Sequence, residues 1–159
     1  MRKVIVWAAA AAALCGVVAG VEVFGPYRVP AGPFADGPAC TETLARLPQR
    51  LLGRERDAVR GTGAAGWGDG AVVLRCGVRP PAPTVDSCVN VNGVDWVLDD
   101  GRAGHGGKWV FTTYGRETAV SVEFEGGQVA GDALVVINTS LGHIARKSRC
   151  LGTDDVAIG

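Results

Sequence analysis

The chain has 159 residues, of which 47% are hydrophobic and 20% are charged, and its formal net charge at pH 7 is zero. This hydrophobic content excludes a disordered protein, and the length suits one domain with a short appendage. The balanced charge gives no support to nucleic-acid binding, so we expect no nucleic-acid partner.

The N-terminus carries the strongest signal. Arg2 and Lys3 precede an uncharged apolar run over residues 4–21. As a helix this run would be about 27 Å long, close to the ~30 Å hydrocarbon core of a bilayer. The two cations should stay in the cytoplasm, so we expect a single-pass protein of the cytoplasmic membrane with its C-terminal domain outside. Cleavage near Gly20 would instead make residues 1–24 a signal peptide and the protein a secreted one.

A third alternative is a lipoprotein acylated at Cys15, which is disfavoured because Leu14 stands where a small residue is required. All three alternatives export the rest of the chain. We expect a membrane anchor or signal segment at 1–24, a Pro/Gly-rich extended tether at 25–39, an exported disulfide-containing domain at 40–152 and a tail at 153–159.

The first element after the tether is predicted at residues 40–60. Leu44, Leu47 and Leu51 have helical spacing, and Pro48 interrupts them, so we expect one kinked helix or two short helices. The glycine-rich stretch 61–70 follows as a loop. It contains a formal G-x-G-x-x-G match but lacks the preceding strand that a dinucleotide site needs, so we expect no cofactor there.

Alternating apolar residues predict strands further along the chain. They fall at 71–76, at 88–100 with Asn92-Gly93 as a hairpin turn, at 108–114 and at 117–124. Leu134, Ile137, Leu141 and Ile144 then form the apolar stripe of a final helix over 132–147. The predicted fold class is α+β, an antiparallel sheet of about four to five strands with two helices on one face, preceded by the N-terminal membrane helix.

Four cysteines lie outside the apolar segment: Cys40, Cys76, Cys88 and Cys150. An even number outside the cytoplasm indicates two disulfides. The spacing matches neither a zinc site nor the Cys-x-x-Cys of redox enzymes. We favour Cys76–Cys88, which would join neighbouring strands across a proline-rich loop, and Cys40–Cys150, which would join two helices packed side by side.

Few residues point to chemistry. Arg116 could offer a guanidinium to an anion, or pair with a nearby glutamate. His105 lies in a glycine-rich loop near Asp99 and Asp100, but such a loop preorganises metal ligands poorly. Trp67 could line a ligand surface or fill the edge of the core. We therefore name Arg116, His105 and Trp67 as candidate ligand contacts and expect no catalytic residue, metal or cofactor.

Several short motifs are fairly specific when taken together. They are Leu47-Pro48, the Trp67-Gly68 loop, VLRCGV at 73–78 with prolines after it, GVDWVL at 93–98, FTTYGR at 111–116 and a late cysteine. On these motifs the chain resembles an actinobacterial membrane-anchored family of unknown function, of the DUF3515 type, over nearly all of residues 38–150. The resemblance implies one N-terminal membrane segment and an exported domain with paired cysteines, and it assigns no activity. One departure is Thr118, where the family tends to have proline.

These observations predict an envelope-exposed domain that contacts the membrane through residues 4–21. We expect a non-catalytic binding module in cell-envelope biology, with an envelope protein or a cell-wall component as its partner. Two alternatives stay open. One is a small envelope hydrolase, and the other is a ligand-sensing domain that uses the glycine-rich loops and Arg116.

Overall fold

A computed structural model describes residues 26–99, 101, 107–126 and 130–151 of the chain. The apolar run at 4–21, His105 and the tail at 153–159 lie outside these residues. Within the described ranges, no helix is both long enough and apolar enough to span a bilayer.

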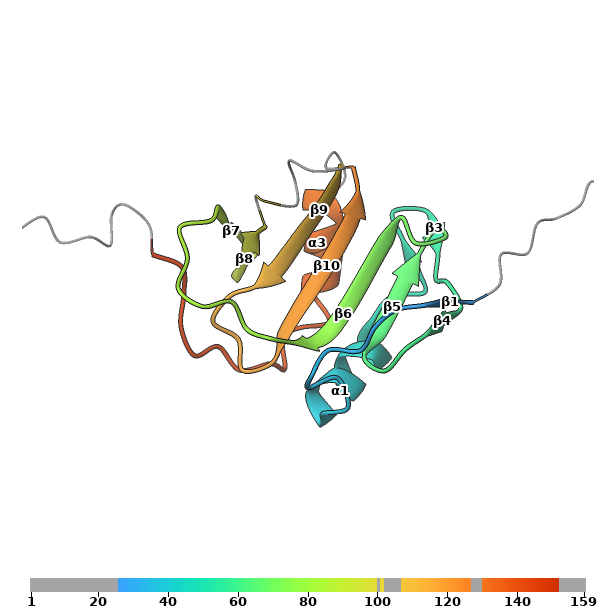
Figure 1. The fold of residues 1–159 in the computed structure, drawn as a ribbon, viewed down its shortest axis with the longest axis horizontal. Helices are drawn as coiled ribbons and strands as arrows, with labels where there is room; N and C mark the ends of the chain where they lie inside the picture. Colours follow the sequence, from blue (N-terminus) through green and yellow to red (C-terminus); the bar gives the residue numbers. More distant parts are fainter. Residues whose placement is uncertain (1–25, 100, 102–106, 127–129, 152–159) are drawn as a thin grey trace, which may run out of the picture.

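The centre of the fold is an antiparallel sheet of six strands in the order β5-β6-β10-β9-β8-β7 (Figure 1). Its strands are β5 (Ala64–Trp67), β6 (Val72–Val78), β7 (Cys88–Val91), β8 (Val94–Leu98), β9 (Lys108–Thr113) and β10 (Ala119–Glu125). Two small sheets lie beside it, one pairing β1 (Tyr27–Arg28) with β4 (Val59–Arg60), the other pairing β2 (Arg50–Leu51) with β3 (Arg54–Glu55). The helices are α1 (Pro38–Arg46) and α3 (Ala130–Asn138).

The predicted fold class is wrong. The described chain is mostly β, with six strands in the main sheet in place of four to five, and its two helices are short. They lie at different places along the sheet, since α3 lies behind β9 and β10 while α1 lies near the end of β6 (Figure 1). The membrane helix that the prediction included falls outside the described residues.

Local chemistry explains why both helices are shorter than expected. Leu47 is extended because the residue before a proline is disfavoured in the helical region, so α1 ends at Arg46. The residues after Pro48 form β2, β3 and β4, with Leu51 fully buried. The last helix ends at Asn138, and Leu141 and Ile144 reach the core from turns. The helical spacing of these apolar residues therefore reflects their burial in the core and does not mark a continuous helix.

The strand predictions from residue 71 to 124 are confirmed, including the hairpin at Asn92-Gly93, whose two residues have φ of 46° and 82°. Positive φ at both central residues is typical of the tight turn that joins two antiparallel strands. Strand β5 was missed, because it lies in a glycine-rich stretch that the sequence marks as a loop.

The core lies between one face of the sheet and α3. Leu74, Val122 and Phe111 are in register across β6, β10 and β9, and Phe124 meets Phe111 edge to face at 5.9 Å. Ala133, Leu134 and Ile137 of α3 belong to the same buried cluster. The helix thus covers the face that carries the large apolar side chains.

Two buried tryptophans have their indole N–H groups satisfied. Trp67 donates to the Pro48 carbonyl at 3.1 Å, and Trp96 donates to Asn138 Oδ1 at 3.1 Å. Asn138 also donates to the Val91 carbonyl at 2.6 Å, which fastens α3 to β7. Both indoles are fully buried, and these hydrogen bonds avoid the stability cost of a buried polar group without a partner.

The other face of the main sheet carries no helix and is the one seen in Figure 1. One row of aligned residues crosses all six strands on this face. It consists of Ala64, Arg75, Ser121, Thr112, Val97 and Cys88. We call this side the uncovered face.

The segment expected as an extended tether packs against the domain over its described part. Val29 and Ala35 are buried, and Tyr27 donates to Asp57 Oδ2 at 2.8 Å. The Phe34 amide donates to the Gly77 carbonyl at 2.9 Å. Gly77 has φ of 75°, and a Cβ there would lie 2.3 Å from the Phe34 carbonyl carbon, so only glycine permits this close approach.

The four cysteines form two disulfides, as predicted, but the predicted pairing is wrong. Cys40 pairs with Cys76 and Cys88 pairs with Cys150, with Cα–Cα distances of 5.4 and 6.5 Å. In the sheet, β10, β9 and β8 separate β6 from β7, and Cys76 faces the core while Cys88 lies on the uncovered face. Cys76 and Cys88 therefore cannot meet.

The two disulfides should differ in their resistance to reduction. Cys40 and Cys76 are fully buried, whereas Cys88 is exposed. Since exchange requires access of a thiolate to sulfur, we expect low concentrations of dithiothreitol to open Cys88–Cys150 first. Stepwise reduction, alkylation and peptide mass spectrometry would measure the order. In guanidinium the difference should disappear, and first opening of Cys40–Cys76 in the folded protein would contradict the order expected from burial.

A candidate binding cavity beside an exposed disulfide

A cavity of about 340 Å³ lies on the uncovered face beside the Cys88–Cys150 disulfide. Two segments far apart in the sequence form it together with β8 and the residue after β9. Its lining residues are Pro83, Thr84, Val85, Asp86, Cys88, Val97, Tyr114, Cys150 and Leu151. We call this space the disulfide cavity.

The proline-rich segment 79–87 forms one side of the disulfide cavity. It must reach β7 at one edge of the sheet from β6 near the other edge. The prolines at 80, 81 and 83 narrow the backbone conformations of this crossing, which keeps it extended. Val85 is fully exposed at 103%, so the segment presents an apolar side chain to solvent.

The C-terminal segment, which includes Cys150 and Leu151, forms the opposite side of the disulfide cavity, and Asp95 binds it. This carboxylate on β8 is only 6% exposed. It accepts hydrogen bonds from the Cys150 amide at 3.0 Å and from Asn90 Nδ2 at 2.6 Å. The Asp95 carbonyl accepts from the Tyr114 amide at 2.8 Å. One buried acid thus connects three of the segments around the disulfide cavity.

Arg116 fastens the same C-terminal segment from the other end. Its Nη1 donates to the Ile144 carbonyl at 2.6 Å and its Nη2 to the Gly93 carbonyl at 3.4 Å. Burial and the nearby charge of Arg146 lower the pKa of Arg116, and the Asp95 carboxylate opposes them. Because an arginine stays charged even so, the guanidinium serves as a fixed structural donor here.

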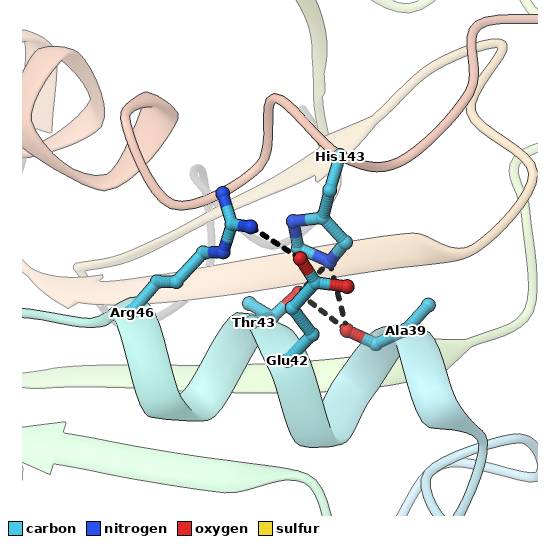
Figure 2. A network of polar contacts seen from close by, with 5 residues as sticks. All are labelled: Ala39, Glu42, Thr43, Arg46 and His143. Carbon is cyan, nitrogen blue, oxygen red and sulfur yellow. Dashed lines mark hydrogen bonds and ion pairs between the residues drawn. The ribbon is translucent and has the colours of Figure 1, made fainter.

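His143 joins the C-terminal segment to α1 (Figure 2). Its Nε2 lies 3.0 Å from the Ala39 carbonyl and 3.3 Å from Thr43 Oγ1, and Thr43 itself donates to Ala39 at 2.8 Å. Arg46 and Glu42 pair one turn apart beside it. His143 Nδ1 is buried and finds no partner within the described part of the chain. These contacts give the histidine a structural role.

The residues that the sequence marked as candidate ligand contacts do not form one site. Trp67 is buried in the core and Arg116 binds backbone carbonyls, while His105 lies outside the described residues. Neither Trp67 nor Arg116 lines the disulfide cavity. The described ranges also contain no group of three or more His, Cys, Asp or Glu side chains placed to hold a metal ion.

Asp95 is the organising residue that sequence reasoning missed. A carboxylate in the middle of an apolar strand, in Val94-Asp95-Trp96, was the available signal. Its partner Cys150 is separated from it by more than fifty residues, and no local pattern connects them.

The chemistry of the disulfide cavity favours binding. Its lining combines apolar side chains and a disulfide with three polar side chains, Thr84, Asp86 and Tyr114. Ligand sites in proteins commonly combine an apolar lining with a few such polar groups. The prolines, the disulfide and Asp95 hold this lining in place before any partner arrives.

One protein-family model matches the chain over residues 3–148, and its description is a protein of unknown function (DUF3515). No curated protein and no solved structure matches the chain.

Replacing Asp95 should loosen the disulfide cavity. In Asp95→Asn an NH₂ group replaces one carboxylate oxygen and cannot accept the hydrogen bond that the Cys150 amide or Asn90 Nδ2 donates to that oxygen. We therefore expect a loss of about 2 kcal/mol in the free energy of unfolding. Amide exchange at Cys150 should also speed up. Denaturant unfolding and hydrogen exchange would measure both. The control is Asp86→Asn, at an exposed acid in the same lining, which should change stability by less than about 0.5 kcal/mol; equal effects would contradict the role of Asp95.

Proposed function

We propose that this chain, which belongs to the DUF3515 family of proteins of unknown function, is a non-catalytic binding module that docks a protein of the cell envelope at the disulfide cavity. The observation that carries this proposal is the exposed apolar surface beside that cavity. Val85 is 103% exposed and Leu151 is 74% exposed, and both line it.

The composition of this surface favours a protein partner over a cell-wall polymer. Its apolar residues are aliphatic and proline side chains, and Tyr114 is the one aromatic in the lining. An apolar centre with polar groups at its rim is typical of protein interfaces. Thr84 and Asp86 supply polar groups within the same lining.

The rigidity of the lining also supports docking. Each side chain that must be ordered on association costs about 0.5–1.5 kcal/mol. The disulfide and the Asp95 hydrogen bonds order the C-terminal segment in advance. Docking of a partner would therefore require less ordering of this module, and the net binding free energy would be more favourable.

Export is the second part of the proposal. Disulfides persist in oxidising compartments, and this chain has two. The apolar run at 4–21 follows two cations and has the length of a membrane span. We therefore place the domain outside the cytoplasmic membrane, held there by residues 4–21.

Site-specific crosslinking in living cells would test the docking surface. A photo-reactive amino acid at position 85 of the full-length chain should give one discrete protein adduct, identified by mass spectrometry. The control is position 135, since Val135 is an exposed apolar residue on α3 that does not line the disulfide cavity. Adducts at 135 and none at 85 would overturn the proposal. Glycan adducts at 85 would show a cell-wall partner instead.

Cell fractionation would test the anchor. The full-length protein should stay in the membrane pellet after alkaline carbonate extraction, and protease added to spheroplasts should degrade the domain. A variant with Arg2 and Lys3 replaced by glutamate should lose this orientation. A mature protein that begins near residue 21 and appears in the medium would contradict the anchor and support cleavage.

A further inference from the structure

A second cavity, of about 350 Å³, lies on the uncovered face where the N-terminal segment passes β6 and β10. Six charged side chains line it, three of each sign: Arg28, Arg75, Lys108, Asp69, Glu123 and Glu125. We call it the charged cavity. It shares no lining residue with the disulfide cavity.

Only one pair of these charges neutralises itself. Lys108 Nζ lies 2.6 Å from Glu123 Oε1, and this hydrogen bond and the charge of Glu123 raise the pKa of Lys108. The four other charged side chains form no ion pair with any described residue, and they are Arg28, Arg75, Asp69 and Glu125. Arg28, Arg75 and Asp69 therefore lie outside any ion pair among the described residues, while Glu125 lies opposite Lys108 in the β9–β10 register and its charge also raises the pKa of Lys108.

Arg75 has a hydrogen-bond donor that the described residues leave unsatisfied. Its Nε is buried and has no hydrogen-bond partner among the described residues. Its neighbour in register on β10 is Ser121, while the nearest acid on that strand, Glu123, is held by Lys108. A buried donor without an acceptor destabilises the fold, so an acceptor supplied by a ligand would offset that cost.

The free acids lie toward the opposite end of the charged cavity. The Glu125 amide donates to the Ala71 carbonyl, and Asp69 is in the turn just before Ala71. Arg75 is four residues beyond Ala71 on β6, which is about 13 Å at 3.3 Å per residue. This distance explains why the charges have not paired with one another across the cavity.

The acidic end is also rigid. Asp57 accepts hydrogen bonds from the amides of Asp69 at 3.0 Å and Gly70 at 2.9 Å, and from the Tyr27 hydroxyl at 2.8 Å. Burial, together with the hydrogen bond and charge of Asp57, raises the pKa of Tyr27 well above its ordinary value. Tyr27 therefore stays neutral and adds no charge to the lining.

We propose that the charged cavity binds a small zwitterion of dipeptide size, with its carboxylate at Arg75 and Arg28 and its ammonium group at Asp69 and Glu125. A guanidinium suits a carboxylate because it offers parallel N–H donors. An extended dipeptide spans about 7 Å, and the arginine and glutamate side chains cover the rest of the distance between the two ends. The volume lies within the usual range of about 300–1,000 Å³ for ligand cavities.

A zwitterion also fits better than a simple anion. Free carboxylates in the same lining would repel a phosphate or a dicarboxylate, and the two arginines would repel a simple amine. A ligand with both charges satisfies all four groups at once. This gives the chain a ligand-binding site that is separate from the proposed docking surface.

Equilibrium dialysis of the full-length protein in detergent against radiolabelled glycylglycine would test the site. We expect saturable one-to-one binding. N-acetyl-glycylglycine lacks the ammonium group and glycylglycine amide lacks the carboxylate, so each should compete at least tenfold more weakly than glycylglycine. Equal competition by the acetylated compound would overturn the proposal in favour of an anion site, and no binding at millimolar ligand would overturn it entirely.

Variants locate the site on the chain. Arg75→Gln and Glu125→Gln should each weaken glycylglycine binding at least tenfold, while Arg79→Gln, at an exposed arginine in the proline-rich segment, should not. Circular dichroism would confirm that each variant is folded. If a variant does not fold, competition by the two capped dipeptides still tests the site in the unchanged protein. Normal binding by both cavity variants would overturn the assignment. Crosslinking at position 85 is independent of this result.

Discussion

The pairing of β6 with β10 is the constraint on which the rest of the structure depends. These strands are far apart in sequence, yet six residue pairs join them from Phe124 beside Val72 to Ala119 beside Val78, with one shift of register between Ala119 and Val120. Because β10 occupies this place, β7 is displaced to the far edge of the sheet. The proline-rich segment must then cross from β6, near one edge of the sheet, to β7 at the other edge. The disulfide cavity lies where this segment meets β7.

The same pairing separates the two disulfides by environment. Cys76 faces the core beside Val120 and meets Cys40 of α1, whereas Cys88 lies on the uncovered face beside Val97 and meets Cys150. One disulfide therefore holds α1 to the central sheet, and the other holds the C-terminal segment to its edge. The two disulfides stabilise different parts of one domain.

Most of what sequence analysis predicted correctly is local. Alternation identified β6, β8, β9 and β10, and Asn92-Gly93 identified the hairpin, because pleating and turn chemistry act over a few residues. The failures are equally instructive. Leu47 and Leu51 are buried as the pattern required, but Leu47 follows the end of α1 and Leu51 lies in a short strand, since burial can be satisfied by more than one backbone. Arg116 was singled out as a ligand contact, and backbone carbonyls occupy it instead.

From the sequence by itself came the positions of five of the six strands in the main sheet, the apolar face that each would bury, and the presence of two disulfides. Only the tertiary structure decided the strand order, the partner of each cysteine and the convergence of charged side chains at Arg75 and Glu125. The physical reason is the range of the interactions. Side-chain periodicity and turn propensity are written over a few adjacent residues, whereas strand order and cavities arise from contacts between segments tens of residues apart, which no local spacing specifies.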